Sequence, residues 1–161
     1  MAPCWTYSSA TRPNEMNAMK LLIGYGNTMR QDDGIGWLIA DHLAPQYDDT
    51  DVTVIQAHQL MPEIASSMAD ADRVIFVDAS IEGVAGEIQV QQLQPAVELG
   101  DAHALTPSQI LRLTEYLYGQ CPTTYLVTIT GALFDLGDTL SEAVEAAVPQ
   151  AVSAIQSLLA D

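Results

Sequence analysis

Residues 20–45, KLLIGYGNTMRQDDGIGWLIADHLAP, hold the pattern that decides the fold of this chain. The segment opens with an apolar run that ends in glycines, which is typical of a short buried strand. Apolar residues then recur at the spacing of one helix face, at Ile35, Leu38, Ile39 and Leu43. Pro45 ends that helix, because proline has no backbone N–H with which to continue it. The segment therefore predicts a strand, a loop over residues 24–36, and a helix.

The rest of the chain continues this alternation of strands and helices. Buried strands are expected over residues 51–56 (DVTVIQ), 73–80 (RVIFVDAS) and 123–130 (TTYLVTIT). Residues 86–93, GEIQVQQL, alternate apolar and polar side chains, so we expect an edge strand with one wet face. Thr106, Pro107 and Gln109 predict a capped helix start, and Gly119 predicts the end of that helix. We predict a three-layer α/β fold: a twisted, mostly parallel sheet with helices on both faces and one antiparallel edge strand.

Composition indicates one compact domain with a short extension. The chain has 161 residues, of which 48% are hydrophobic and 16% charged, which suffices for one core. Residues 1–18 contain no signal-peptide h-region, so we expect a flexible extension followed by a single α/β domain over residues 19–161. Cys4 and Cys121 show no CxxC or Cys/His spacing, so we expect neither a disulfide framework nor a cysteine zinc site. These features favour the cytoplasm.

The net charge of −16, from 21 acidic and 5 basic residues, argues against two classes of partner. Such a field repels nucleic acid and anionic membranes, so neither is expected to bind. No apolar run approaches the ~18–20 residues needed to span a bilayer. The charge favours cationic partners or metal ions, although acidity can also serve solubility alone.

The loop over residues 24–36 begins like a dinucleotide-binding fingerprint and then departs from it. That fingerprint needs a third glycine three residues after the second, where this chain has Met29. Asp32 and Asp33 would also repel the pyrophosphate of a dinucleotide. Nucleotide binding is therefore disfavoured.

The same loop can be explained in part as a turn. Gly24 and Gly26 permit unusual dihedral angles and close backbone approach. Asn27 can form a hydrogen bond with its own turn, and one aspartate could cap the helix that begins near Gly34. This explanation accounts for one carboxylate but not for two, because adjacent carboxylates repel each other unless a cation or a donor lies nearby.

Asp78 closes the strand over residues 73–80 at its C-terminal end. Ligands of open α/β sheets bind outside these ends, near a topological switch point. If this strand and the first strand are parallel neighbours, Asp33 and Asp78 meet at one edge of the sheet. Capping of the next turn could also explain Asp78 alone. With a histidine, the two carboxylates would form a set suited to Zn²⁺ or Ni²⁺, with open positions left over.

Three histidines are candidates for that third position. His42 falls on the predicted first helix beside apolar residues, so it is a poor candidate. His58 follows the second strand and therefore lies on the correct side of the sheet. His103 stands shortly before the helix start at Thr106, in a loop suited to reach a strand end. We favour His103 by position and keep His58 in reserve.

Several segments of the chain resemble the maturation endopeptidases of nickel–iron (NiFe) hydrogenases. They are GYGNTMRQDDGIG (24–36), HQLMPEIA (58–65), VIFVDAS (74–80), HALTPSQIL (103–111) and GALFDLGDTLSEAV (131–144). In this order they cover most of residues 20–159. HQLMPEIA and HALTPSQIL are most similar to the branch that serves bidirectional, NAD-linked hydrogenases of the kind found in cyanobacteria.

The resemblance implies a protease with the sheet and helices described above. Family members remove a short C-terminal extension from the precursor of the hydrogenase large subunit, after nickel has been installed there. The resemblance implies catalytic and metal-binding roles for Asp33, Asp78 and His103, the last from its place before Pro107. The residues that would shape the loop are Gly24, Gly26, Asn27, Asp32 and Gly34.

The resemblance also implies that nickel arrives with the precursor and is not a permanent cofactor; zinc or cadmium could substitute for it. The expected partner is the precursor, and the chain is expected to be a monomer. Peptide cleavage could proceed through a metal-polarised carbonyl or through a water activated by an aspartate. Two other classes of function stay open: a non-catalytic chaperone that binds nickel or holds the precursor, and a nucleotide-binding α/β domain.

Overall fold

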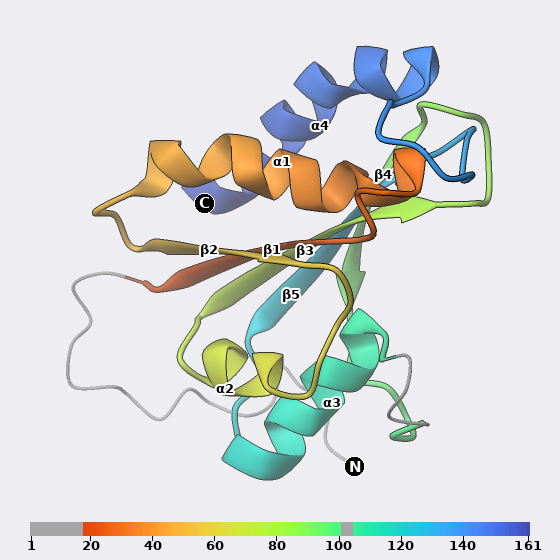
Figure 1. The fold of residues 1–161 in the computed structure, drawn as a ribbon. Coiled ribbons are helices and arrows are strands. Elements are labelled where there is room, and N and C mark those ends of the chain that lie inside the picture. The colour runs from red at the N-terminus through yellow and green to blue at the C-terminus, as the bar shows by residue number, and fades with distance from the viewer. Residues whose placement is uncertain (1–17, 101–104) are drawn as a thin grey trace.

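A five-stranded sheet forms the middle layer of the protein (Figure 1). The computed structural model describes residues 18–100 and 105–161. The strands are β1 (Lys20–Tyr25), β2 (Val52–Ala57), β3 (Arg73–Ser80), β4 (Ile88–Leu93) and β5 (Thr123–Thr130), in the order β2-β1-β3-β5-β4. β4 pairs antiparallel with β5 at one edge, and the other pairs of neighbours are parallel. The predicted mostly parallel sheet with one antiparallel edge strand is confirmed.

Helices cover both faces of this sheet, which gives the predicted three layers. α1 (Ile35–Leu43) and α4 (Glu142–Ala160) lie on one face, and α2 (Ile64–Ala69) and α3 (Pro107–Tyr118) lie on the other (Figure 1). A 3₁₀ turn, η2 (Gln31–Gly34), precedes α1, and a second, η3 (Ala44–Tyr47), follows it. The predicted extension over residues 1–18 falls outside the described residues except for Ala18, so it stays a prediction.

Each face of the sheet contributes to its own hydrophobic core. On the central strands, Leu22 and Ile75 face α1 and α4, whereas Leu21, Ile23 and Phe76 face α2 and α3. This alternation follows from the opposite directions of successive side chains on a strand. Burial of each such side chain stabilises the fold by about 1.5–3 kcal/mol. The central strands are therefore apolar on both faces, as their sequence predicts.

Gly36 allows the start of α1 to pack directly against the C-terminal ends of two strands. A Cβ atom at Gly36 would lie 2.2 Å from the carbonyl oxygen of Val77 and 2.6 Å from that of Tyr25. Only a residue without a side chain fits at that distance. This close approach holds the turn before α1 over the C-terminal ends of β1 and β3.

The start and end of α3 agree with the sequence prediction, whereas the start of α1 is formed in another way. At α3, Thr106 Oγ1 accepts from the backbone N–H of Gln109 and the Gln109 side chain accepts from that of Thr106, so the predicted capping box is confirmed. Gly119 ends α3 with a φ of 65°. At α1 the N-cap is Gly34 and no side chain caps it, so helix capping, the alternative explanation of one aspartate, does not hold. Both aspartates of the preceding turn have other partners.

Cys121 is disulfide-bonded in the structure, which contradicts the expectation that the cysteines form no disulfide. The absence of a CxxC motif could not exclude a disulfide, because disulfide formation depends on the distance between two sulfur atoms in the folded protein.

α4 meets the length and hydropathy criteria for a membrane-spanning helix, the one helix among residues 18–100 and 105–161 to do so. Its apolar content has another explanation here, since Val144, Ala151 and Ile155 are fully buried against the sheet. One or two such helices are weak grounds for a membrane span.

Candidate functional site

A cleft opens where the topology of the sheet reverses. β1 lies between β2 and β3, so the chain crosses to one side of β1 and then returns to the other. Ligands of such sheets bind in the crevice outside the C-terminal ends of the strands at this point. The cleft has a volume of about 230 Å³ and is lined by Tyr25, Gly26, Asp33, His58, Gln59, Leu60, Asp78 and Leu105. The structure therefore brings the predicted residues Asp33, Asp78 and His58 to one cavity.

Asp33 reaches the cleft from η2, in a loop that is tightly packed on itself. Its Oδ2 accepts a hydrogen bond of 3.0 Å from the backbone N–H of Asn27. The Asn27 side chain in turn accepts from the N–H of Met29 at 2.9 Å, which closes the expected local turn. Gly26 has a φ of 142°, and a Cβ there would lie 1.9 Å from the carbonyl oxygen of Asp33. The loop residues thus fix where Asp33 sits.

Asp78 approaches the cleft from the end of β3, the strand beside β1. Its Oδ1 accepts a hydrogen bond of 2.7 Å from the N–H of Ala79, and its carboxylate also accepts from the Tyr25 hydroxyl. Burial, with a further contribution from the negative charge of Asp33, raises the pKa of Asp78 from 3.8 to about 6, although both hydrogen bonds act to lower it. Asp78 therefore titrates close to neutral pH, where a carboxyl group can both take and give a proton.

Tyr25 is a site residue that the sequence reasoning missed. Its ring packs edge-on against Phe76 with centroids 6.2 Å apart, and its hydroxyl donates to Asp78. Burial and the charge of Asp78 raise the pKa of the Tyr25 hydroxyl above its usual range, so the group stays protonated as a donor. The available signal was a tyrosine at the C-terminal end of a strand, where its polar tip can meet a ligand site.

Asp32 plays a different part from its neighbour Asp33. Its side chain is fully buried. Its Oδ2 accepts from the N–H groups of Ala132 (2.7 Å) and Leu133 (2.9 Å), and its Oδ1 accepts from that of Ser141 (2.8 Å). Burial alone would raise the pKa of Asp32, but these hydrogen bonds outweigh it and lower the pKa. Asp32 thus fastens the loop of η2 to the loop before α4 and is closed off from the cleft.

The histidines lie in three different situations. His58 is exposed, lines the cleft and stacks on Trp37 with ring centroids 6.4 Å apart. His42 is exposed on the last turn of α1. His103 lies outside the described residues, while Leu105, two positions later, lines the cleft. Within residues 18–100 and 105–161, no three His, Cys, Asp or Glu side chains lie close enough to hold a metal ion.

Replacement of Asp78 by asparagine is expected to stabilise the protein at pH 7. Because the folded-state pKa of Asp78 is raised, the carboxyl group favours the folded state most below about pH 3.8, where it is protonated. This contribution to the free energy of unfolding is lost as the pH rises through about 6. A two-unit shift corresponds to at most ~3 kcal/mol, which partial solvent exposure reduces to about 1–2 kcal/mol. Urea unfolding should show that gain for Asp78→Asn at pH 7 and a smaller one at pH 4. Equal stability of variant and wild type at both pH values would contradict it.

Neither a protein-family model nor a curated protein sequence matches this chain. Its fold, however, matches solved structures of hydrogenase maturation proteases. The NiFe hydrogenase maturation protease HycI from Thermococcus kodakarensis KOD1 superposes with a TM-score of 0.69 at 24% identity, over 91% of this chain and 96% of that one. The hydrogenase maturating endopeptidase HybD from E. coli gives 0.68 at 21% identity, over 88% and 91%.

A third structure of this kind extends the comparison to another group of organisms. The hydrogenase 2 maturation peptidase from a Thaumarchaeota archaeon gives a TM-score of 0.65 at 23% identity, over 88% of this chain and 98% of that one. In each case the match covers nearly the whole of both chains. The chain thus has the α/β fold of hydrogenase maturation proteases from bacteria and archaea, with two acidic side chains in the cleft at its topological switch point.

Proposed function

We propose that this protein is an endopeptidase that removes the C-terminal extension from the nickel-loaded precursor of a NiFe hydrogenase large subunit. The observation that carries the proposal is the cleft itself. Asp33 and Asp78, from two neighbouring parallel strands and their loops, line one cavity in a fold shared with hydrogenase maturation proteases.

The electrostatics of the cleft suit a cation that arrives with the substrate. Asp33 and Asp78 repel each other, and burial leaves Asp78 poorly solvated when charged. A metal ion between them would relieve both penalties, because an opposite charge favours the ionised form. The free protein would then discriminate against a metal-free precursor, whose approach leaves the repulsion in place. In this proposal nickel belongs to the substrate, and zinc or cadmium could substitute for it.

The donor set is compatible with such a shared ion. Carboxylate and imidazole groups suit nickel and zinc, and the precursor would supply the remaining ligands. We assign the metal-facing positions to Asp33, Asp78 and His103, with His58 in reserve. Tyr25 would hold the carboxylate of Asp78 in place through its hydroxyl.

The chemistry of cleavage has two routes that these residues can support. The ion can polarise the scissile carbonyl, or a carboxylate can activate the attacking water. Asp78 fits the second task, since it lines the cleft at the end of β3 and its carboxylate is held by the N–H of Ala79 and the hydroxyl of Tyr25. Asp33 accepts a backbone N–H of its own loop, which holds its carboxylate in place for either route.

We further propose the bidirectional, NAD-linked class of hydrogenase as the source of the precursor. This rests on the segments HQLMPEIA and HALTPSQIL, of which the first supplies His58 and Leu60 to the cleft. We expect the protein to act as a monomer.

Histidine variants decide which imidazole completes the site. We expect His103→Ala to lower processing of nickel-loaded precursor by about 100-fold and His58→Ala to lower it by less than about threefold. Processing is followed by gel shift and intact mass, with both variants adjusted to equal folded concentration. Full activity of His103→Ala together with a large loss in His58→Ala would transfer the role to His58. Precursor that is bound by the wild type but never shortened would instead indicate a holding chaperone.

A further inference from the structure

Three loops beside the cleft adjoin one another, and we call them together the loop platform. It consists of residues 27–33, 80–87 and 130–141. Gln31 N–H donates to the carbonyl of Gly137 at 3.0 Å, and Gly137 N–H donates to that of Met29 at 2.9 Å. Gly131 N–H donates to the carbonyl of Ser80 at 2.8 Å. The three loops are therefore held together by backbone hydrogen bonds at the C-terminal edge of the sheet.

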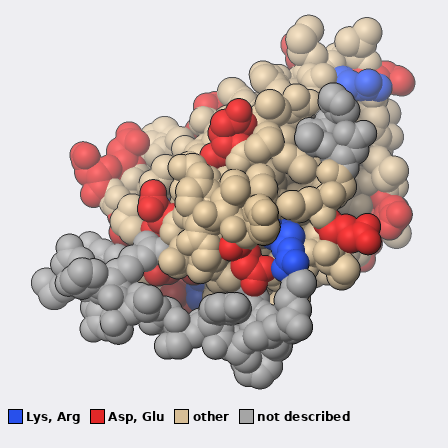
Figure 2. All heavy atoms as spheres, turned by 90° about the horizontal axis from the view of Figure 1, so that it is seen from below, with Lys and Arg blue, Asp and Glu red and all other residues tan. Residues whose placement is uncertain are grey.

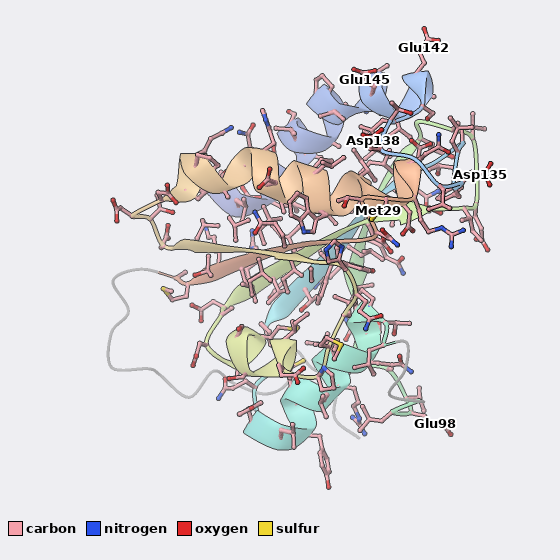
Figure 3. The ribbon with its side chains drawn as sticks, in the orientation of Figure 1. Met29, Glu98, Asp135, Asp138, Glu142 and Glu145 are labelled. Carbon is pink, nitrogen blue, oxygen red and sulfur yellow. The ribbon has the colours of Figure 1, made fainter. Side chains whose placement is uncertain are left out.

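The platform exposes large apolar side chains from all three loops. The exposed fractions are 66% for Met29, 81% for Ile81, 76% for Val84, 43% for Leu133 and 85% for Leu136. Single exposed apolar residues are ordinary, but a group of them on adjoining loops is typical of a surface that binds another protein. Figure 3 shows Met29 at the same end of the molecule as Asp135 and Asp138.

The same end of the molecule is strongly acidic. Exposed carboxylates on the platform and the first turn of α4 come from Glu82, Glu87, Asp135, Asp138, Glu142 and Glu145. Figure 3 labels the last four of these. The basic residue on the platform is Arg30, and its guanidinium donates to the carbonyl of Phe134. The face seen from below in Figure 2 also shows more acidic than basic side chains.

Two of the four basic side chains among the described residues, Lys20 and Arg73, lie at the other end of the sheet, while Arg30 is on the platform and Arg112 is on α3. Lys20 begins β1 and Arg73 begins β3, and they donate to the carbonyls of Leu159 and Leu158 at the C-terminus of α4. Asp48, Asp49, Asp51, Asp70 and Asp72 precede β2 and β3 at that end, so both ends of the sheet are acidic. The platform differs in combining its carboxylates with a group of exposed apolar side chains, so it would attract a partner that carries basic side chains around an apolar patch, whereas a nucleic acid or an anionic membrane would be repelled.

We propose that the loop platform is the docking surface for the protein substrate, which meets it with a patch of lysine or arginine around apolar side chains. This inference rests on the proposed function and adds where the substrate is held. A second copy of this chain is disfavoured as the occupant, since two such acidic faces repel each other. Asp32 fastens residues 27–33 to residues 130–141 and is followed directly by Asp33, so docking on the platform would set the register of the peptide in the cleft.

The test is steady-state processing of the nickel-loaded precursor by two double variants of the platform. Ile81→Ser/Leu136→Ser removes the most exposed apolar side chains, and Asp135→Asn/Asp138→Asn removes two charges from the same loop. We expect each to raise KM by about tenfold with kcat unchanged, and to weaken precursor binding to the same degree. Added salt should raise KM for the wild type more steeply than for the charge variant.

Matched controls replace exposed residues of the same kinds elsewhere on the surface. Tyr116→Ser/Leu117→Ser changes exposed apolar side chains on α3, and Asp48→Asn/Asp49→Asn changes exposed acids before β2, at the opposite edge of the sheet. Both controls should keep the wild-type KM. Unchanged KM and binding in the platform variants, equal losses in the controls, or a platform-dependent dimer of this chain would overturn the docking proposal.

The outcome separates docking from catalysis. If the wild type binds precursor without shortening it, and the platform variants lose that binding, docking stands and the proposed protease activity falls. If the wild type cleaves the precursor and the platform variants match it in KM, the protease activity stands and docking falls.

Discussion

Asp33→Asn and Asp78→Asn are each expected to lower precursor processing by at least about a thousandfold while the protein stays folded. Both side chains line the cleft, and each would lose the negative charge with which it attracts the ion of the substrate. Asparagine keeps the shape of aspartate and one acceptor oxygen. At position 33 it can therefore still accept from the N–H of Asn27, and at position 78 from the N–H of Ala79. Initial rates of processing, measured at equal folded concentration, check this prediction.

A control comes from an exposed carboxylate far from the cleft. Asp48→Asn, ahead of β2, should keep the wild-type rate. Near wild-type rates for Asp33→Asn and Asp78→Asn would show that the cleft is not the site of cleavage. A loss of rate that is matched by a loss of folded protein would instead assign a structural role to the two carboxylates.

Asp32→Asn is expected to have the largest effect on stability, at a cost of about 3 kcal/mol. The buried carboxylate accepts three backbone N–H groups, from Ala132, Leu133 and Ser141. An amide has one acceptor oxygen, and its NH₂ group would face at least one N–H donor without a partner. For a chain of this size the loss corresponds to a fall in Tm of about 10 °C.

The matched comparison is Asp33→Asn, one position along the same turn. Asp33 is only partly buried, and the structure gives its carboxylate one hydrogen bond, from Asn27. Its replacement should cost about 1 kcal/mol or less. Thermal unfolding of both variants at pH 7 makes the comparison, and equal losses for the two would contradict the separate roles of the neighbouring aspartates. Adjacent carboxylates would thus divide stability and function between them.

Much of the fold could be predicted from the sequence because its signals are local. The apolar run of β3 and the capping box of α3 each depend on neighbouring residues, and both are present in the structure. β4 is the predicted edge strand, but its burial does not alternate as expected, because Val90 is exposed like the neighbouring glutamines. The shared location of Asp33 and Asp78 needed one more step, the general rule that ligands bind at the C-terminal ends of parallel strands. The order of β1 and β3 in the sheet satisfies that condition.

The remaining features depend on contacts between distant parts of the chain. Asp32 and Ser141 are 109 positions apart, so no local pattern could assign the bond between them. The sequence alone could not exclude the alternative of an aspartate cap at α1, for the same reason: Asp32 is bonded to the loop before α4 and Asp33 faces the cleft. Tyr25 was missed because its partner Asp78 becomes its neighbour only when β1 and β3 pair.

The most direct test of the proposed function is the intact mass of a purified NiFe hydrogenase large-subunit precursor before and after incubation with this protein. The precursor is used in nickel-loaded and nickel-free forms. The account predicts that the loaded form loses the mass of a C-terminal peptide through a single cut, and that the nickel-free form keeps its full mass. A loaded precursor of unchanged mass, or cleavage of both forms at the same rate, would contradict it.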